Sequence, residues 1–426
     1  MPYASPPQLY LKEIFKMATV LLIGTLDTKG PETAYLRDQI QALGGETLVL
    51  DSGILGEPNG ITADIDRRAV AQAAGSDLET LRQAGTRGKA VEEMLKGVRK
   101  LALELAANSK IHGVVSLGGA EGAVLAAAAM KVLPMGFPKL IVSPIASGQR
   151  RFGPLVGTRD TLVMHSIVDI LGLNPISCAV YDNAAAAIYG MAQRYAERQP
   201  QRRARRAIAA TMLGNTTKPL LRMRPHFEAQ GYDFVIFHAN GVGGIAMEEL
   251  MLVGYFDGVL DYTLSEVAGA VAGGYHNGGK TRLDALAQAA LPAVVVLGCL
   301  DFVVFGARHE VPEAYQGRPT YYHNPEFTLV RLTHAEQLEA AHFLTEKLNR
   351  ARGAVTVIAP LGGGSVMDIE GGAFWQPETN QAVRDVLKNG LKRGIRYLEL
   401  AGHINEDSFA DAVQAEAFTL FGEFYA

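Results

Sequence analysis

Short apolar runs rich in Val, Ile and Leu alternate with stretches of helical period along the chain from Ala18 onward. This alternation is typical of βαβ units around a mainly parallel sheet. Residues 53–87 show no strong apolar period, so we expect a long functional loop with short helices there. In the first half of the chain the predicted strands are 19–25, 46–52, 112–118 and 139–145, and the predicted helices are 31–43, 88–108, 121–133, 161–171 and 183–198.

The alternation stops at the arginine-rich segment 197–206 and then restarts, which predicts a second α/β domain. The segment is short and has no interleaved aromatic residues, so we interpret it as an exposed linker rather than a basic patch for an anion. GTLDTKG (24–30) and GNTTKP (214–219) each follow a predicted apolar strand and precede a predicted helix. This weak internal similarity suggests two similar domains. We therefore predict an extension at 1–17, a first domain at 18–196, the linker, and a second domain at 207–426. The predicted strands of the second domain are 207–214, 233–241, 257–263, 293–301, 354–362 and 395–403.

Composition and charge narrow the possible partners. Forty basic and 44 acidic side chains give a net charge of −4, which argues against a nucleic-acid partner. The longest apolar run, 291–306, contains Asp301 and falls short of the roughly 20 residues that a membrane helix needs, so we expect no membrane partner. The only cysteines, Cys178 and Cys299, have no CxxC spacing, which indicates neither a disulfide framework nor a thiolate metal site and favours a reducing, cytoplasmic location.

Four glycine-rich segments follow predicted strands, where helix N-termini offer unpaired N–H groups to anions. None has the GxGxxG spacing of a dinucleotide site, although Asp51 ends the second strand where a ribose hydroxyl would be recognised. Each segment alone could be a plain turn that needs a positive φ, but four in one chain lead us to expect at least one phosphate-binding loop. The segments are GTLDTKG (24–30), SLGGAEG (116–122), HANGVGG (238–244) and APLGGGS (359–365).

GTLDTKG has the richest chemistry of the four. Lys29 can offer an ammonium group to a phosphate, and Thr25 and Thr28 can donate hydroxyl groups. Asp27 can hold Mg²⁺ or accept a proton as a general base. The alternative is a capped helix start with Asp27 and Lys29 exposed to solvent.

A Walker A spelling occurs at 274–281, GYHNGGKT, with Lys280 in the lysine position. A P-loop needs an apolar strand directly before it, whereas the preceding LSEVAGAVAGG (264–274) is typical of a helix start or a turn. We therefore interpret the spelling as a chance match.

Other polar residues give weaker signals. Ser143 and Ser147, at a predicted strand end, could cap a helix or contact phosphate, but they do not form a GxSxG elbow. His165 lies on a predicted helix, where we expect a core histidine rather than a catalyst. Five further residues could supply ligands for Zn²⁺ or Mn²⁺, but no HxxxH or HxH spacing connects them. They are Asp301, His309, Glu310, His323 and His403.

A series of motifs between Ala18 and Val413 resembles the tobamovirus-resistance-protein-like (Tm-one-like) ATP-binding domain family. The resemblance implies two Rossmann-like domains, each a mainly parallel sheet flanked by helices, in a homodimer that binds ATP with Mg²⁺. The chain departs from the family at GGKT, where relatives have a lysine-free turn before Arg282 and Leu283. The motifs are GTLDTKG, LGGAEG, SPIASGQ, VGTRDTLVMHSIVDILGLN, FHANGVGGIAMEEL, GCLDFVVFG, YYHNPEFTLVR and HINEDSFADAV. The nucleotide-binding residues that the resemblance implies are Gly24, Thr25, Asp27, Thr28, Lys29, Gly118, Gly119, Glu121 and Gly122.

The resulting hypothesis is a nucleotide-binding protein that handles a small-molecule substrate by phosphoryl or nucleotidyl transfer. Lys29 would then stabilise charge, Asp27 or Glu121 would hold the metal, and Ser143 and Ser147 would be further nucleotide contacts. Two alternatives remain open: a nucleotide-gated module that binds another protein without turnover, and a sugar- or acid-processing α/β enzyme that uses no nucleotide.

Overall fold

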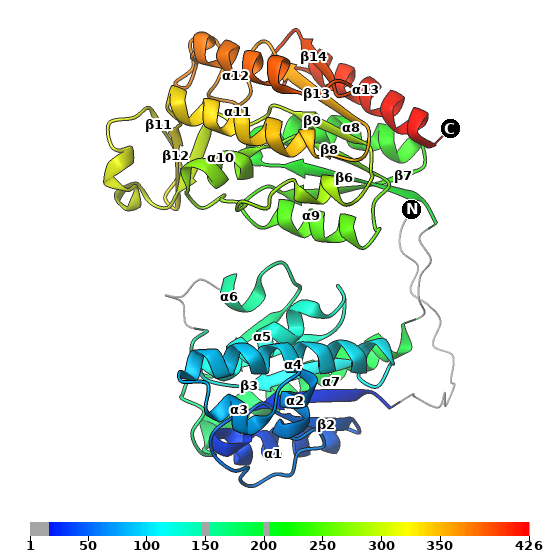
Figure 1. The fold of residues 1–426 in the computed structure, drawn as a ribbon, viewed down its shortest axis with the longest axis vertical. Helices are drawn as coiled ribbons and strands as arrows, with labels where there is room; N and C mark the ends of the chain where they lie inside the picture. Colours follow the sequence, from blue (N-terminus) through cyan, green and yellow to red (C-terminus); the bar gives the residue numbers. More distant parts are fainter. Residues whose placement is uncertain (1–16, 147–152, 199–203, 426) are drawn as a thin grey trace. The chain divides into compact units, whose positions relative to one another are not determined.

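The computed structural model describes residues 17–146, 153–198 and 204–425 (Figure 1). The chain divides into two compact units, Met1–Gln201 and Arg202–Ala426, which we call unit 1 and unit 2. Nearly all of the predicted extension and half of the predicted linker lie outside the described residues, as does Ser147.

Unit 1 is built on a five-stranded parallel sheet with the order β2-β1-β3-β4-β5. All residues of the three central strands are buried, as expected when helices cover both faces of a parallel sheet. The strands are β1 (Thr19–Gly24), β2 (Glu46–Asp51), β3 (Gly113–Leu117), β4 (Lys139–Ser143) and β5 (Leu162–His165).

Alternate residues of β1 point into two separate cores, one on each face of this sheet. Leu21 and Ile23 pack with the residues of α2 to α5, whereas Val20 and Leu22 pack with those of α1 and α7. Figure 1 shows α4 and α5 on one face and α1 on the other. The helices are α1 (Leu26–Ala42), α2 (Arg67–Ala73), α3 (Leu78–Arg82), α4 (Arg87–Ala107), α5 (Ala120–Val132), α6 (Gly153–Val156) and α7 (Pro175–Glu197).

Unit 2 contains a six-stranded parallel sheet with the order β14-β13-β9-β8-β6-β7. Its first strand, like that of unit 1, has the second strand on one side and the third on the other. The prediction of an α/β protein with two Rossmann-like domains is therefore confirmed. The strands are β6 (Arg206–Met212), β7 (Tyr232–His238), β8 (Gly258–Asp261), β9 (Ala293–Val296), β13 (Val355–Pro360) and β14 (Arg396–Leu400).

Helices cover both faces of this sheet as well. One core joins alternate sheet residues to α9, α10, α11 and α12, and a second joins the others to α8 and α13. The helices are α8 (Thr217–Ala229), α9 (Gly243–Leu252), α10 (Ser265–Ala272), α11 (His334–Asn349), α12 (Pro377–Gly390) and α13 (Asp407–Tyr425), with short 3₁₀ turns η1 (Gly214–Thr216), η2 (Asp284–Ala287), η3 (Arg308–Glu310) and η4 (Glu313–Tyr315).

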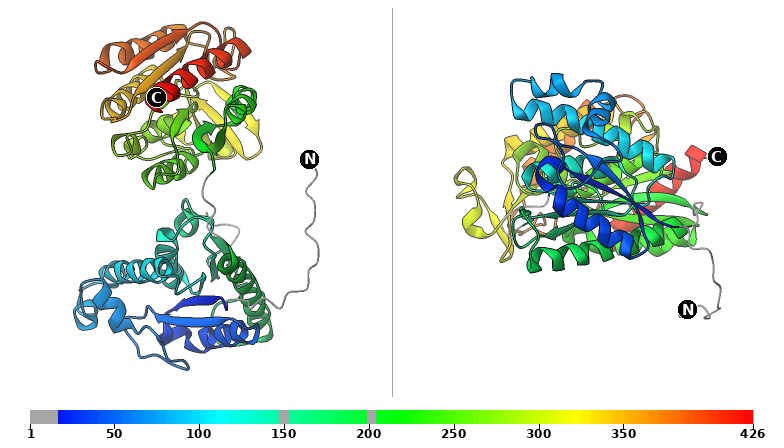
Figure 2. Two further views of the ribbon diagram at one scale, coloured as in Figure 1. Left: turned by 90° about the vertical axis from the view of Figure 1, so that its right-hand side faces the viewer. Right: turned by 90° about the horizontal axis from the view of Figure 1, so that it is seen from below.

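Unit 2 also carries a three-stranded antiparallel sheet that the sequence analysis missed, with the order β10-β12-β11. We call it the lobe; β11 and β12 lie at one end of unit 2 in Figures 1 and 2. Most of β11 is exposed, so this strand lacks the apolar pattern by which buried strands are predicted. The lobe strands are β10 (Phe302–Phe305), β11 (Thr320–Asn324) and β12 (Phe327–Arg331).

The predicted helix at 161–171 was wrong. Residues 162–165 form the edge strand β5, and His165 pairs with Ser143 of β4 instead of facing a helical core. Ile167 then adopts a φ of 65°, which a helix does not tolerate. The apolar residues of this segment match the spacing of a helix, but their pairing with β4 decides the structure. In the part of the chain that the structure describes, no helix combines the length and apolar character needed to cross a membrane.

Candidate functional site

A pocket of about 990 Å³ lies at the carboxyl edge of the unit 1 sheet. Because β1 and β3 are neighbouring parallel strands, with Ile23 paired to Ser116, the loops that follow them meet at this edge. The strand order reverses between β1 and β3, and ligands of open α/β sheets bind at such a switch point. We call it the switch-point pocket, lined by Thr25, Asp27, Thr28, Lys29, Gly53, Ile54, Leu55, Gly56, Leu81, Arg82, Gln83, Gly85, Thr86, Ala90, Gly119, Ala120, Glu121 and Gly122.

The GTLDTKG loop forms the start of α1. The carbonyl oxygen of Thr25 accepts hydrogen bonds from the N–H groups of Thr28 (3.1 Å) and Lys29 (2.9 Å), and the Thr25 and Thr28 hydroxyl oxygens lie 3.0 Å apart. Thr25 is the N-cap residue, but its side chain makes no capping hydrogen bond. Lys29 departs from helical geometry, with φ −128° and ψ 22°, and its ammonium group donates to the carbonyl oxygen of Ile170. The loop thus presents two hydroxyl groups and an ammonium group at one edge of the pocket.

Asp51, at the end of β2, holds the chain around the pocket together. Its Oδ1 accepts hydrogen bonds from the N–H groups of Leu26 (3.2 Å) and Gly53 (2.9 Å), and its Oδ2 lies 2.7 Å from Nε of Arg67. Asp51 is fully buried and Arg67 is 4% exposed, so this ion pair is internal. Both carboxylate oxygens of Asp51 are engaged, and the expectation that it could recognise a ribose hydroxyl is not supported.

An unpaired donor and an unpaired acceptor lie beside Gly53. A Cβ atom at Gly53 would lie 2.7 Å from Nη2 of Arg67 and 3.1 Å from Oδ1 of Asp27. Both atoms are buried, and neither has a hydrogen-bond partner within the described residues. The other oxygen of Asp27 accepts from the N–H group of Gly56 at 3.1 Å. Because buried polar groups are rarely left unpaired, this point suits a water molecule, an ion or a polar group of a ligand.

The SLGGAEG segment forms the start of α5 on the other side of the pocket. Gly118 must be glycine, since a Cβ atom there would lie 2.7 Å from the backbone carbon of Gly122. A Cβ atom at Gly119 would meet nothing within 4 Å, and this N-cap residue has no side chain to cap the helix. The start of α5 lines the pocket with Gly119, Ala120, Glu121 and Gly122, so its partial positive charge faces the same space as Lys29.

The structure thus brings most of the predicted site residues together. Gly24 ends β1 and Gly118 directly follows β3, and neither lines the pocket. Ser143 is buried and does not line the pocket; its Oγ accepts from the N–H group of Ile145 at 3.4 Å. The sequence analysis missed Arg67, whose only signal was its place in the long loop 53–87. The predicted residues that line the pocket are Thr25, Asp27, Thr28, Lys29, Gly119, Glu121 and Gly122.

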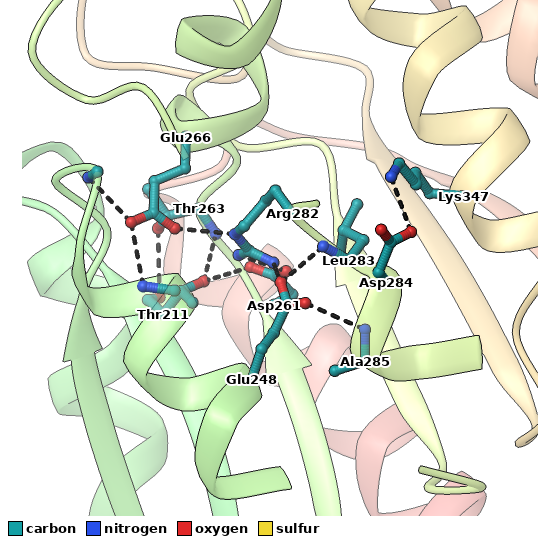
Figure 3. Close-up of polar contacts among 12 residues, drawn as sticks. Thr211, Glu248, Asp261, Thr263, Glu266, Arg282, Leu283, Asp284, Ala285 and Lys347 are labelled. Atoms are coloured by element: carbon teal, nitrogen blue, oxygen red, sulfur yellow. Dashed lines mark hydrogen bonds and ion pairs between the residues drawn. The ribbon is translucent and has the colours of Figure 1, made fainter. Parts of the chain in front are cut away.

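The HANGVGG loop of unit 2 already holds a carboxylate of the protein. Oε1 of Glu266 accepts hydrogen bonds from the N–H groups of Gly241 (2.9 Å) and Gly244 (3.0 Å), and its Oε2 lies 2.8 Å from Nε of Arg282 (Figure 3). Glu266 therefore occupies the place that a ligand anion would take. Both N–H groups are therefore already satisfied by a side chain of the protein.

Arg282 is the centre of this network and is 1% exposed. Besides Glu266, its guanidinium group contacts Oδ2 of Asp261 at 2.7 Å and Oε1 of Glu248 at 2.8 Å. Burial opposes the positive charge, but the three carboxylates outweigh it and raise the pKa of Arg282 above its usual value. The network is a structural clamp whose polar groups satisfy one another.

The remaining two candidates in unit 2 are also accounted for. In APLGGGS, the N–H group of Gly364 donates to Oδ2 of Asp368 at 2.9 Å, and the Ser365 hydroxyl donates to Oδ2 of Asp301 at 2.8 Å. GYHNGGKT follows helix α10 and precedes the 3₁₀ turn η2, so the strand–loop–helix context of a P-loop is absent from these described residues. This context agrees with the interpretation of the Walker A sequence as a chance match, which the comparison of Lys29 and Lys280 tests.

Two doubly wound parallel sheets, one with an open pocket at its switch point, define the chain as a two-unit α/β protein of the Rossmann-like class. The N-terminal domain of the uncharacterised protein family UPF0261 matches residues 18–197, and the C-terminal domain of that family matches residues 205–421. The chain belongs to this family, and the predicted resemblance is confirmed.

Relatives from bacteria and plants match most of the chain. A UPF0261 protein of Clostridium tetani is 39% identical over 92% of this chain and 96% of its own length. The ToMV resistance protein Tm-1(GCR237) of Solanum lycopersicum is 34% identical over 92% of this chain and 54% of its own length. Among solved structures, a thioesterase domain from the curacin biosynthetic pathway covers 51% of this chain, and this chain covers 90% of it, at 12% identity and a TM-score of 0.26, too low to add to the argument.

Proposed function

We propose that unit 1 binds ATP together with Mg²⁺ in the switch-point pocket. The observation that carries the proposal is the meeting of the GTLDTKG and SLGGAEG loops in one pocket of about 990 Å³. Sites for drug-sized ligands and cofactors are usually about 300–1,000 Å³, so the space is sufficient for a nucleotide.

The chemistry of the pocket fits a polyphosphate. The starts of α1 and α5 both lie at the pocket, and neither is capped by a side chain of its N-cap residue. Such helix starts attract anions through their N–H groups and dipole. Lys29 adds a full positive charge, and an ammonium group with three donors can bind a phosphate while keeping its contact with Ile170.

Asp27 is the residue best suited to hold the metal ion. Its Oδ1 is buried and has no hydrogen-bond partner among the residues that the structure describes, and carboxylate oxygens are the ligands that Mg²⁺ prefers. Bound there, Mg²⁺ would neutralise phosphate charge. Phosphoryl transfer depends mainly on such positioning and charge stabilisation, so phosphoryl or nucleotidyl transfer is the reaction class that this arrangement would serve.

Calorimetry with ATP, with and without Mg²⁺, tests the proposal. We expect ATP to bind, and Mg²⁺ to tighten binding by about tenfold, because the ion adds one charged contact of roughly 1.5 kcal/mol. In Asp27→Asn, which keeps an acceptor for the N–H group of Gly56, the gain from Mg²⁺ should disappear. Asp38→Asn, at an exposed position on α1, is the matched control and should keep it. Absence of ATP binding at millimolar concentration would refute the proposal.

Incubation with ATP and metabolite mixtures separates an enzyme from a nucleotide-gated binding module. Formation of ADP or AMP that depends on a small molecule would indicate transfer. Binding without turnover would favour the module.

A further inference from the structure

A second pocket, of about 270 Å³, lies in unit 2 at the carboxyl ends of β6 and β7. Its floor consists of buried apolar side chains, Leu213 after β6 and Phe302, Val304 and Leu329 from the lobe. We call it the lobe pocket. The antiparallel sheet of the lobe thus forms one wall of this pocket.

The lobe pocket lies at the same edge of the unit 2 sheet as the switch-point pocket does in unit 1. Each pocket adjoins the loop between the first strand of its unit and the helix that follows. In unit 2 this loop contains Gly214 and Asn215, before α8. The space between β6 and β8 is filled by hydroxyl and carboxyl groups, because Thr211 donates to Asp261 at 2.7 Å and the Thr216 and Thr263 hydroxyl oxygens lie 2.7 Å apart. The opening is therefore shifted towards β7.

Among the described residues, no Asp, Glu, Lys or Arg side chain lines the lobe pocket. Its polar lining includes imidazole and carboxamide groups, among them those of His238, His276 and Asn240. Burial, and then the neighbouring His238, lower the pKa of His276 to about 4, so this ring is uncharged at neutral pH. Its Nδ1 is buried and has no hydrogen-bond partner within the described residues.

Aromatic rings complete the walls. Tyr275 and Phe327 lie edge to face, with ring centroids 6.5 Å apart, and Phe302 belongs to the floor. Planar rings of a ligand can stack on such walls. A charged ligand would lose its hydration on entering, and no carboxylate, ammonium or guanidinium group of the described residues lines the pocket to compensate for that loss. In the described part of the chain, no group of three or more His, Cys, Asp or Glu side chains could hold a metal ion.

We propose that the lobe pocket binds an uncharged, planar heteroaromatic ring, with the ring faces against the aromatic walls and its polar edge towards His276 and the carboxamide groups. This site is separate from the nucleotide site proposed for unit 1 and does not depend on it.

Nicotinamide and uracil are suitable uncharged probes, and nicotinate is the charged twin of nicotinamide with the same ring. Ligand-observed NMR should detect at least one uncharged probe with a dissociation constant of about 1 mM, as expected for a fragment of this size. Nicotinate should bind at least fivefold more weakly than nicotinamide. Absence of binding by both uncharged probes at ten times that concentration, or equal binding of nicotinate and nicotinamide, would overturn the proposal.

Two glycine variants test which pocket binds the probes and which binds Mg-ATP. A Cβ atom meets nothing within 4 Å at Gly214 of the lobe pocket or at Gly119 of the switch-point pocket, and neither glycine has a positive φ. A Cβ atom is therefore tolerated at either position, the rest of a leucine side chain would narrow the pocket that the glycine lines, and melting without ligand verifies the fold. Gly214→Leu should abolish probe binding and leave Mg-ATP binding within twofold, while Gly119→Leu should do the reverse.

These variants keep the two proposals distinguishable. Probe binding that survives in Gly214→Leu would overturn the ring site whatever ATP does. Failure of ATP to bind the unmodified protein would refute the nucleotide proposal and leave the ring site standing if the probes still bind.

Discussion

Replacing Arg282 by methionine should strongly destabilise unit 2. The change removes the guanidinium group that contacts Glu248, Asp261 and Glu266, all of which are 8% exposed or less. Breaking a buried ion pair by removing one partner costs about 3–5 kcal/mol, because the remaining charge is left uncompensated. Three carboxylates are affected here, so we expect a loss of at least about 4 kcal/mol in the free energy of unfolding.

Urea denaturation followed by circular dichroism measures this loss, and Arg222→Met is the matched control. Arg222 contacts Asp407 and Asp411, but its side chain is 38% exposed. Exposed ion pairs contribute about 0–1 kcal/mol, so the control should change stability by no more than that. A loss below about 1.5 kcal/mol in Arg282→Met, close to that of the control, would refute the interpretation of the network as a structural clamp.

Two further predictions concern stability. Gly118→Ala should cost about 1–3 kcal/mol because its methyl group would press on the backbone of Gly122, whereas Gly119→Ala, with open space around it, should stay within about 0.5 kcal/mol in the same urea titration. Burial, with the nearby Asp368 carboxylate, raises the pKa of Asp301 to about 7, above its ordinary value of 3.8. The folded state then binds this proton more tightly than the unfolded state, so the contribution of Asp301 to stability falls as the pH rises from about 4 to about 7. Asp301→Asn should remove this fall, and identical changes in stability between pH 5 and pH 8 in both proteins would contradict it.

The course of the parallel strands could be predicted from the sequence because each central strand is a continuous apolar run. The end of β1 and the end of β3 were recognisable from their glycine residues, and the common direction of the strands explains why these ends meet. The lobe could not be predicted in this way, because β11 is exposed and β10 lies in the same apolar run, 291–306, as β9.

The side-chain contacts inside the two candidate sites could not be predicted from the sequence, because they join residues far apart in the chain. Arg67 pairs with Asp51 across a loop without apolar pattern. Glu266, whose carboxylate occupies the HANGVGG loop, lies 22 residues after Gly244 in the sequence. No local sequence pattern distinguishes a loop that the protein itself occupies from one that is open to a ligand. Glycine-rich segments therefore indicated where strands end, but only the packing decides which of them leaves space.

The comparison of Lys29 with Lys280 tests the nucleotide site most directly. Lys29 lines the switch-point pocket, whereas Lys280 is exposed in the Walker A spelling and does not line that pocket. Loss of a charge-assisted contact of roughly 1.5–3 kcal/mol predicts that Lys29→Ala weakens Mg-ATP binding at least about tenfold in calorimetry, with Lys280→Ala within about twofold. Weakening confined to Lys280→Ala, or unchanged affinity in both variants, would contradict the account.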